Sequence, residues 1–185
     1  MKGLGRVGRM IAVAPLVLVA VALAQAPSKD DAALIKDFEQ RVSKYESLRN
    51  ANAGRRTASS SATVVAQQKG EAAQKVQEAW AAKQGDIFTP GITSYFKAQI
   101  KATLDGPQGK KIRASLRHAE PLPDLHLAPN QKYPQNLPLQ STPPTLLLNL
   151  PKLPKELQYR VVGSTFLIYD ESTALIVDLI PGAMP

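Results

Sequence analysis

Two histidines and two carboxylates lie close together in the segment HAEPLPDLH. Glu120 and Asp124 stand between His118 and His126, and side chains of these kinds are ligands of divalent metals. The spacing matches no standard zinc pattern, and the two intervening prolines favour a stretched chain. At about 3.3 Å per residue, an extended chain would hold the imidazoles about 25 Å apart. We therefore expect two surface histidines, with a specific metal site as the alternative.

The motifs of nucleophilic catalysis are absent from the sequence. It contains no Gly-x-Ser-x-Gly elbow, no Ser-x-x-Lys motif and no His-Glu-x-x-His motif. A carboxylate pair, Asp170 and Glu171, falls in a predicted exposed turn. We therefore expect a protein that is not an enzyme, with no catalytic residue, no cofactor-binding residue, no metal ligand and no cofactor. A hydrolase, with an active site formed only when the chain folds, is the third hypothesis for the function.

Basic side chains gather in one part of the chain, and they are Lys97, Lys101, Lys110, Lys111, Arg113 and Arg117. A solvated helix face is the first interpretation, and docking to a polyanion or to a phosphate-bearing lipid is the alternative. The net charge of the chain is +8. Without the first 24 residues, 20 basic residues face 15 acidic ones and leave +5. This mild excess suits an anionic envelope partner and is not typical of nucleic-acid binding, so no nucleic-acid partner is expected.

The first 24 residues have the anatomy of a secretory signal peptide. A basic start precedes the apolar run from Met10 to Leu23, and the small-x-small site Ala22-Leu23-Ala24 follows. The run is shorter than the roughly 20 residues that span a bilayer. We expect cleavage after Ala24 and no stable membrane span afterwards, with an uncleaved anchor as the alternative. The chain has no cysteine, and an exported domain without disulfides favours a bacterial periplasmic or extracellular location.

Residues 25–119 are predicted to be helical, with about four helices. Asp30–Leu48 is amphipathic and Ser28 is its expected N-cap. A loop over 50–63 leads to an alanine-rich helix over Val64–Gln84, whose Trp80 is expected to anchor the core. Thr89 and Pro90 predict the start of the third helix, and Ile92, Phe96 and Ile100 share one of its faces. A short fourth helix is expected to open at Pro107. The apolar stripe of the first helix is expected to pack on the rest of the domain, with binding of a partner or of a second copy as the alternative.

Residues 120–154 contain nine of the 15 prolines. Such a density disfavours helix and predicts an ordered, extended segment along the domain. Short edge strands are expected at Asp124–Leu127 and Thr145–Leu150. The alternative is a disordered spacer.

Residues 155–185 predict a three-stranded antiparallel meander. A two-residue turn at Gly163-Ser164 sets Val161 opposite Phe166 and Tyr159 opposite Ile168. A four-residue turn over Asp170–Thr173 then sets Ile168 opposite Leu175 and Phe166 opposite Val177. One face of the predicted sheet is apolar, with Tyr159, Val161, Phe166, Ile168, Leu175, Val177 and Leu179. The opposite face is Arg160, Val162, Thr165, Leu167, Tyr169, Ile176 and Asp178, and it requires cover from the Leu-Pro leader (Leu150–Pro154) or from a second chain.

The same stretch resembles a module of exported bacterial proteins. The Leu-Pro leader, Tyr159-Arg160, Gly163, Phe166–Asp170 and Ile176-Val177-Asp178 are similar to the C-terminal part of the RcnB and CigR families. The resemblance covers about a fifth of the chain and implies a fold and an exported location. The whole chain resembles uncharacterised secreted bacterial proteins. Because the RcnB family is linked to periplasmic nickel and cobalt homeostasis, the resemblance also implies an alternative function.

Together these features predict an α+β protein in which the N-terminal helices pack on the C-terminal meander, with residues 25–185 as one domain. The expected function is a non-catalytic, exported cell-envelope protein that acts through protein or envelope contacts, including contacts with its own copies. The alternative function is periplasmic handling of a divalent metal of the nickel or cobalt type.

Overall fold

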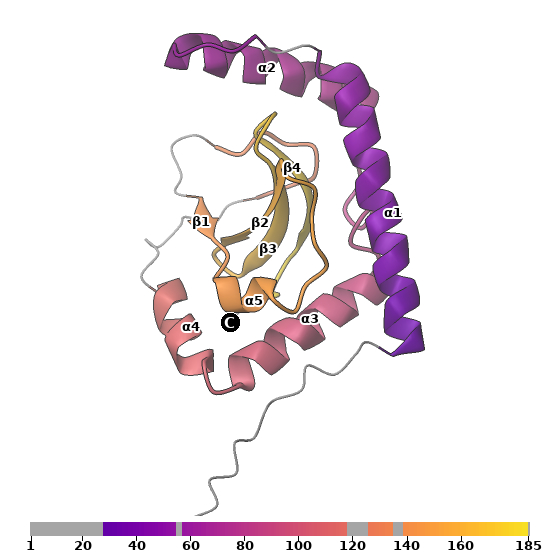
Figure 1. Ribbon diagram of the computed structural model, residues 1–185, viewed down its shortest axis with the longest axis vertical. Helices are drawn as coiled ribbons and strands as arrows, with labels where there is room; N and C mark the ends of the chain where they lie inside the picture. Colours follow the sequence, from indigo (N-terminus) through magenta and orange to yellow (C-terminus); the bar gives the residue numbers. More distant parts are fainter. Residues whose placement is uncertain (1–27, 55–56, 118–125, 135–138, 185) are drawn as a thin grey trace, which may run out of the picture.

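The computed structural model describes residues 28–54, 57–117, 126–134 and 139–184. Its order of elements is α1 (Lys29–Asn52), α2 (Ala62–Ala79), α3 (Pro90–Asp105), α4 (Gly109–Arg117), β1 (Gln140–Ser141), α5 (Pro144–Leu147), β2 (Leu157–Val162), β3 (Thr165–Asp170) and β4 (Leu175–Ile180). The helices surround an antiparallel sheet of order β1-β2-β3-β4 (Figure 1). The predicted α+β fold with a C-terminal meander is confirmed.

The helix starts follow the local sequence closely. The Ser28 hydroxyl accepts the Asp31 N–H at 3.1 Å, and the Asp31 carboxylate accepts the Ser28 N–H in return, which completes a capping box. Pro90 lies in the first turn of α3, where its missing N–H costs no helical hydrogen bond. The second helix is shorter than predicted, because it ends at Ala79 rather than at Gln84.

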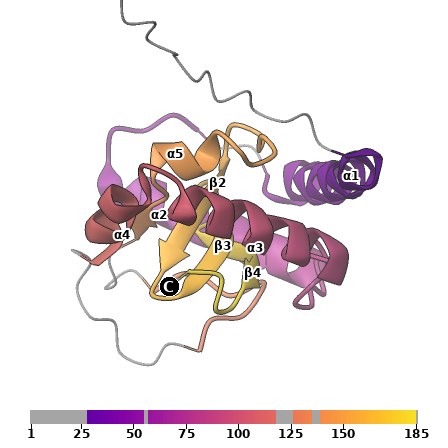
Figure 2. The same cartoon turned by 90° about the horizontal axis from the view of Figure 1, so that it is seen from below.

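The main core lies between the helices and one face of the sheet. Figure 2 shows α3 crossing in front of the strands when they are seen from below, and α1 end-on beside them. The rings of Phe38, Phe88, Phe96 and Phe166 meet there, with centroids 5.2–6.4 Å apart in neighbouring pairs. Such spacing is typical of favourable aromatic packing. Side chains from α1, α2, α3, α4 and α5 join this cluster.

The first hairpin has the predicted register. Val162 pairs with Thr165 across the two-residue turn, Val161 with Phe166 and Tyr159 with Ile168. Gly163 takes a φ of +57°, which a glycine adopts without steric cost.

The register of the second hairpin differs from the prediction. Asp170, not Ile168, pairs with Leu175, because the turn comprises 171–174 and Ala174 closes it with a φ of +59°. A β-bulge between Ile168 and Tyr169 then shifts the pairing by a further residue. Leu179 consequently lies on the second face of the sheet and Ile180 in the main core, the reverse of the prediction for Leu179.

The proline-rich segment covers the second face. Tyr133, with Leu127 and Leu139, packs on Val162, Leu167, Ile176 and Leu179. The backbone of the same segment pairs with the outer edge of β4, where Asn130 N–H donates to Ile176 O at 2.8 Å and Tyr133 N–H to Ala174 O at 2.9 Å. The predicted cover by the Leu-Pro leader is wrong, because Leu150 and Leu153 pack in the main core.

The strand predicted over Thr145–Leu150 is also wrong. Pro144 begins the short helix α5, and Leu146 points into the main core at 1% exposure. A proline at the first helical position has a suitable φ and needs no N–H partner, so the proline pair here starts a helix instead of preventing it. The strand predicted at Asp124–Leu127 lies partly outside the described residues.

Candidate functional site

The predicted metal segment lies mostly outside the described part of the chain. His118, Glu120 and Asp124 are not described, and His126 is exposed. Within the described ranges, no group of three or more histidines, cysteines, aspartates and glutamates could hold a metal ion. The metal site at His118 and His126 therefore stays a prediction.

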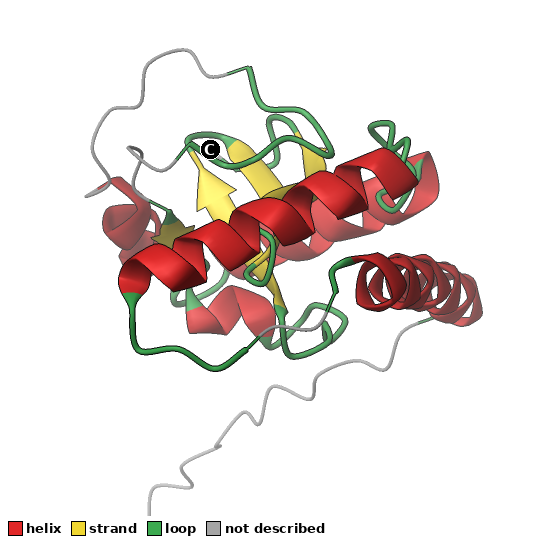
Figure 3. Ribbon diagram, turned by 90° about the horizontal axis from the view of Figure 1, so that it is seen from above, coloured by secondary structure: helices red, strands yellow, loops and turns green. Residues whose placement is uncertain are grey.

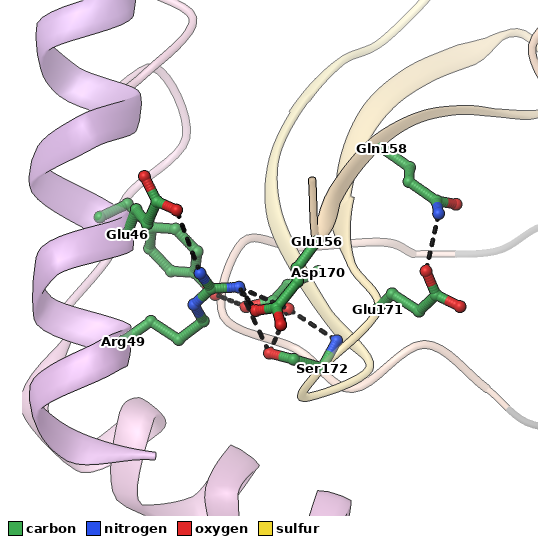
Figure 4. A network of polar contacts seen from close by, with 8 residues as sticks. Glu46, Arg49, Glu156, Gln158, Asp170, Glu171 and Ser172 are labelled. Atoms are coloured by element: carbon green, nitrogen blue, oxygen red, sulfur yellow. Dashed lines mark hydrogen bonds and ion pairs between the residues drawn. The ribbon is translucent and has the colours of Figure 1, made fainter. Parts of the chain in front are cut away.

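A buried polar network links α1 to the turn between β3 and β4 (Figure 4). Arg49 in the last turn of α1 is 2% exposed, and its Nη1 lies 2.6 Å from Glu156 Oε2 and 3.6 Å from Asp170 Oδ1. The Tyr45 hydroxyl donates to Asp170 Oδ2 at 2.8 Å, and the Ser172 N–H donates to Asp170 Oδ1 at 2.8 Å. Burial, and then the Asp170 carboxylate, raise the pKa of Tyr45 well above its usual range.

Arg49 was not predicted as part of any site, and its sequence position gives only a weak signal. It continues the apolar stripe of α1 one turn after Tyr45, where a lone cation would be unstable without an acidic partner. The partners Glu156 and Asp170 lie more than a hundred residues away. Because Arg49 and Tyr45 of α1 contact Glu156 and Asp170, the network joins α1 to the sheet.

A second buried carboxylate, Asp178, binds the loop before α3. It accepts the backbone N–H groups of Gly85, Ile87 and Phe88 at 3.1, 2.9 and 2.8 Å, and that of Leu179 at 2.8 Å. Burial raises the pKa of Asp178, and the N–H donors act in the opposite direction. The side chain is 0% exposed, so it fixes the loop and presents no reactive group at the surface.

The predicted basic region is partly neutralised. Asp105 forms ion pairs with Lys101 and with Arg113, the latter at 3.2 Å. The hydrogen bond and charge of Lys101, and then those of Arg113, lower the pKa of Asp105. Lys97, Lys110 and Lys111 are exposed, whereas the side chain of Arg117 is not among the described ones. This arrangement agrees with a solvated helix face.

Trp80 lies at an edge of the main core. Its ring meets the ring of Tyr45 edge-on at a centroid distance of 4.7 Å, and the side chain is half-buried. A hollow of about 520 Å³ beside it is lined by both acidic and basic side chains of α1, including Asp37, Arg41 and Lys44. Arg41 is paired with Asp37 at 2.7 Å and donates to Asp86 O at 2.9 Å. Trp80 thus packs against the main core, as predicted.

The most open apolar surface of the described chain lies around α5. Leu148 is 83% exposed and Leu147 is 42% exposed. Leu147 also lines a groove of about 460 Å³ along β2, which we call the β2-edge groove. Its wall comprises Leu150, Leu153, Leu157 and Tyr159, and its polar lining includes Thr142, Lys152, Gln158 and Arg160. The sequence did not predict this groove. The only local signal is the run of leucines shortly after the Pro143-Pro144 pair, which includes the exposed Leu147 and Leu148.

No family model, no curated protein and no solved structure matches the chain. The resemblance of the C-terminal meander to the RcnB and CigR families therefore remains a prediction. Within the described residues, no helix is long and apolar enough to cross a membrane.

Proposed function

We propose that this protein is a non-catalytic, exported component of the bacterial cell envelope, which acts by binding another protein through the surface around α5. The observation that carries the proposal is the β2-edge groove with Leu147 and Leu148 exposed beside it. Contiguous exposed leucines next to a groove are typical of interaction sites. They are also energetically unfavourable in water, at about 25 cal/mol per Å² of apolar area.

The buried polar groups support binding rather than catalysis. Asp170 and Asp178 are both 0% exposed, and both are bonded within the fold. An active site requires polar groups that converge on a cavity that a substrate can enter. These two carboxylates instead hold α1 and the loop before α3 against the sheet.

Export is proposed from the first 24 residues, and a reporter fusion tests it. Residues 1–30 would be joined to an alkaline phosphatase that lacks its own signal, since this enzyme becomes active only after it leaves the cytoplasm and forms its disulfides. We expect activity from the fusion and none after deletion of the apolar run, Met10–Leu23. An inactive, cytoplasmic fusion would contradict the proposed location.

Photocrosslinking from α5 tests the binding function. The full chain would be produced in a bacterium with a photoreactive amino acid in place of Leu148, and the envelope fraction would be irradiated. We expect a discrete covalent adduct with an envelope protein. The same amino acid in place of exposed Glu71 on α2 is the matched control and should give no adduct. Identical patterns from both positions, or no adduct from either, would argue against binding through α5.

A further inference from the structure

The sheet has an incomplete outer edge at β2. β2 pairs with β3 over six residues, whereas β1 pairs with it only at Val161 and Arg160. β1 ends because Pro143 and Pro144 follow within three residues, and proline has no N–H to donate to a strand ladder. Within the described ranges, the stretch Leu157–Tyr159 therefore has no strand neighbour on this side. Such an edge is a template for an added strand.

The wall of the β2-edge groove lies beside this open stretch. The Tyr159 hydroxyl donates to Pro151 O at 2.9 Å, which holds the loop after α5 against the strand. Leu150 and Leu157 are buried at the base of the groove, at 7% and 3% exposure. The Leu157 N–H already donates to Pro154 O at 3.0 Å, so the part of this edge that could take a new strand is centred on Tyr159. The groove thus offers apolar contacts next to an edge without a strand neighbour in the described ranges, the combination that β-strand addition uses for recognition.

The polar lining of the groove is rich in hydrogen-bond donors and basic groups and poor in acidic acceptors. Thr142 is 5% exposed, and its Oγ1 has no hydrogen-bond partner among the described residues. The Nε atom of Arg160 is buried and also lacks a partner in the described part of the chain, whereas its Nη1 and Nη2 donate to Ser141 and Gln158. Lys152 adds a second cation, and the described residues that line the groove include no aspartate or glutamate. A buried polar group without a partner is unfavourable, so a ligand that accepts hydrogen bonds from these donors would relieve an existing cost.

We propose that the β2-edge groove binds an extended peptide segment that carries a carboxylate, from an acidic side chain or a free C-terminus. The segment would extend the sheet beside Leu157–Tyr159, place apolar side chains on Leu150 and Leu157, and direct its carboxylate to Thr142 and Arg160. This inference rests on the proposed function and names the chemistry of its partner. The open strand edge favours a peptide over a glycan or a lipid, because only a peptide backbone matches its donor and acceptor spacing.

A peptide library tests the proposal directly. A library of hexapeptides with free carboxyl termini would be selected on the protein, which is purified after export of the full chain. We expect enrichment of sequences with alternating apolar residues and a carboxylate at one end. A fluorescein-labelled copy of the most enriched peptide would then be titrated by fluorescence anisotropy. Hydrogen exchange should become slower at Tyr159 when this peptide is bound, because strand addition protects the edge amides.

Thr142→Val distinguishes a contact with the peptide from a contribution to the stability of the fold. The variant keeps the shape of the side chain and removes the unpaired hydroxyl, so the protein should be as stable as the wild type or more stable in urea. The affinity for the labelled peptide should fall about tenfold, since a hydrogen bond to a charged group is lost. Arg160→Gln should weaken binding in the same direction, and Lys111→Gln on the exposed face of α4 should not change it.

Several outcomes would overturn the proposal. These are a library without enrichment for a carboxylate, an unchanged affinity in Thr142→Val, and unchanged hydrogen exchange at Tyr159. Self-association that competes with the peptide in light scattering would assign the groove to a second copy of the chain instead. An adduct from position 148 without any selected peptide would leave the proposed function standing and remove only this inference.

Discussion

Arg49 is the residue whose environment departs most from what its type predicts. An arginine is rarely fully buried unless it is paired, and Arg49 meets Glu156, Asp170 and Glu46 at the point where α1 approaches the sheet. The guanidinium provides several donors in a fixed geometry, which a lysine could not reproduce. The position therefore joins two elements that are far apart in the chain (Figure 4).

Arg49→Met should destabilise the protein strongly. The methionine keeps the apolar stem but leaves the Asp170 carboxylate buried without its cation, and breaking a buried pair costs about 3–5 kcal/mol. Arg41→Met is the matched control on the same helix. Its pair with Asp37 is about half exposed, so the free energy of unfolding should fall by less than about 1 kcal/mol. Urea denaturation followed by circular dichroism measures both, and equal effects would contradict the structural role of Arg49.

Two buried tyrosines predict loss of stability at alkaline pH. Burial raises the pKa values of Tyr45 and Tyr159 above the ordinary value of 10.0. Because the pKa of each tyrosine is higher in the native state than in the unfolded state, the unfolded chain ionises first as the pH rises. The contribution of these tyrosines to the free energy of unfolding is therefore complete below pH 10.0 and decreases above it. The fold should therefore unfold in alkaline solution.

The near-ultraviolet absorbance of tyrosinate, recorded together with far-ultraviolet circular dichroism, measures this effect. Of the five tyrosines, Tyr45 and Tyr159 should ionise only as the helical signal disappears. Tyr95→Phe removes a less buried ring and should leave that late step unchanged. Ionisation of all five tyrosines before any loss of helix would be incompatible with the burial described above.

At the scale of elements, the bulge between β3 and β4 changes the register of the second hairpin beyond Tyr169. It places Asp178 opposite Ile168, whose side chain lies in the main core. From this side the carboxylate reaches the N–H groups of Gly85, Ile87 and Phe88. Bulges commonly redirect a side chain in this way. The loop before α3 is thus held by the strand, and the N-terminus of α3 is fixed with it.

Asp178→Ala should lower the free energy of unfolding by at least about 3 kcal/mol, since several backbone donors lose their acceptor and buried donors without partners are costly. Asp86→Ala is the control in the same loop. Asp86 is exposed and accepts one N–H, from Lys83 at 2.7 Å, so its loss should cost less than about 1 kcal/mol. Chemical denaturation of the two variants provides the comparison. A mild effect in Asp178→Ala would show that the loop does not depend on this carboxylate.

At the scale of the whole molecule, the chain covers both faces of its own sheet. Seen from above, α2 crosses in front of the strands and α1 lies end-on at one side of them (Figure 3). The helices cover the first face, and the segment with Leu127, Tyr133 and Leu139 covers the second. Val162, Leu167 and Ile176 are 5%, 0% and 0% exposed as a result. Self-association is therefore not needed to cover that face.

Tyr133→Ser should uncover the second face. Tyr133 is 6% exposed, and its ring lies 6.1 Å from that of Tyr169. Without the ring, Leu167 and Ile176 become accessible, and exposed apolar area of this kind promotes association. Light scattering should report a higher mean mass, and an apolar dye should bind more strongly. Leu148→Ser removes an exposed side chain and should do neither. An unchanged mass and unchanged dye binding in Tyr133→Ser would mean that the rest of the segment covers the face without it.

Much of the fold was decided by local sequence. The capping box at Ser28, the face of α3 with Ile92, Phe96 and Ile100, and the register of the first hairpin follow from residues within a few positions of each other. Periodicity and turn geometry act over that range, so these features could be predicted. The resemblance, the export and the function drawn from the sequence remain predictions.

Tertiary structure alone decided the rest. The Asp178 carboxylate accepts from amides about ninety residues away. The burial of Arg49 depends on partners more than a hundred residues away, and the cover of the second face depends on where a proline-rich segment crosses the sheet. The candidate β2-edge groove has the same origin. The sequence contains the proline pair that ends β1 and the leucines that follow it, but neither indicates a groove by itself. Only the folded chain places them beside an open strand edge and leaves Thr142 and Arg160 with unpaired donors, because such contacts arise from long-range packing and not from local pattern.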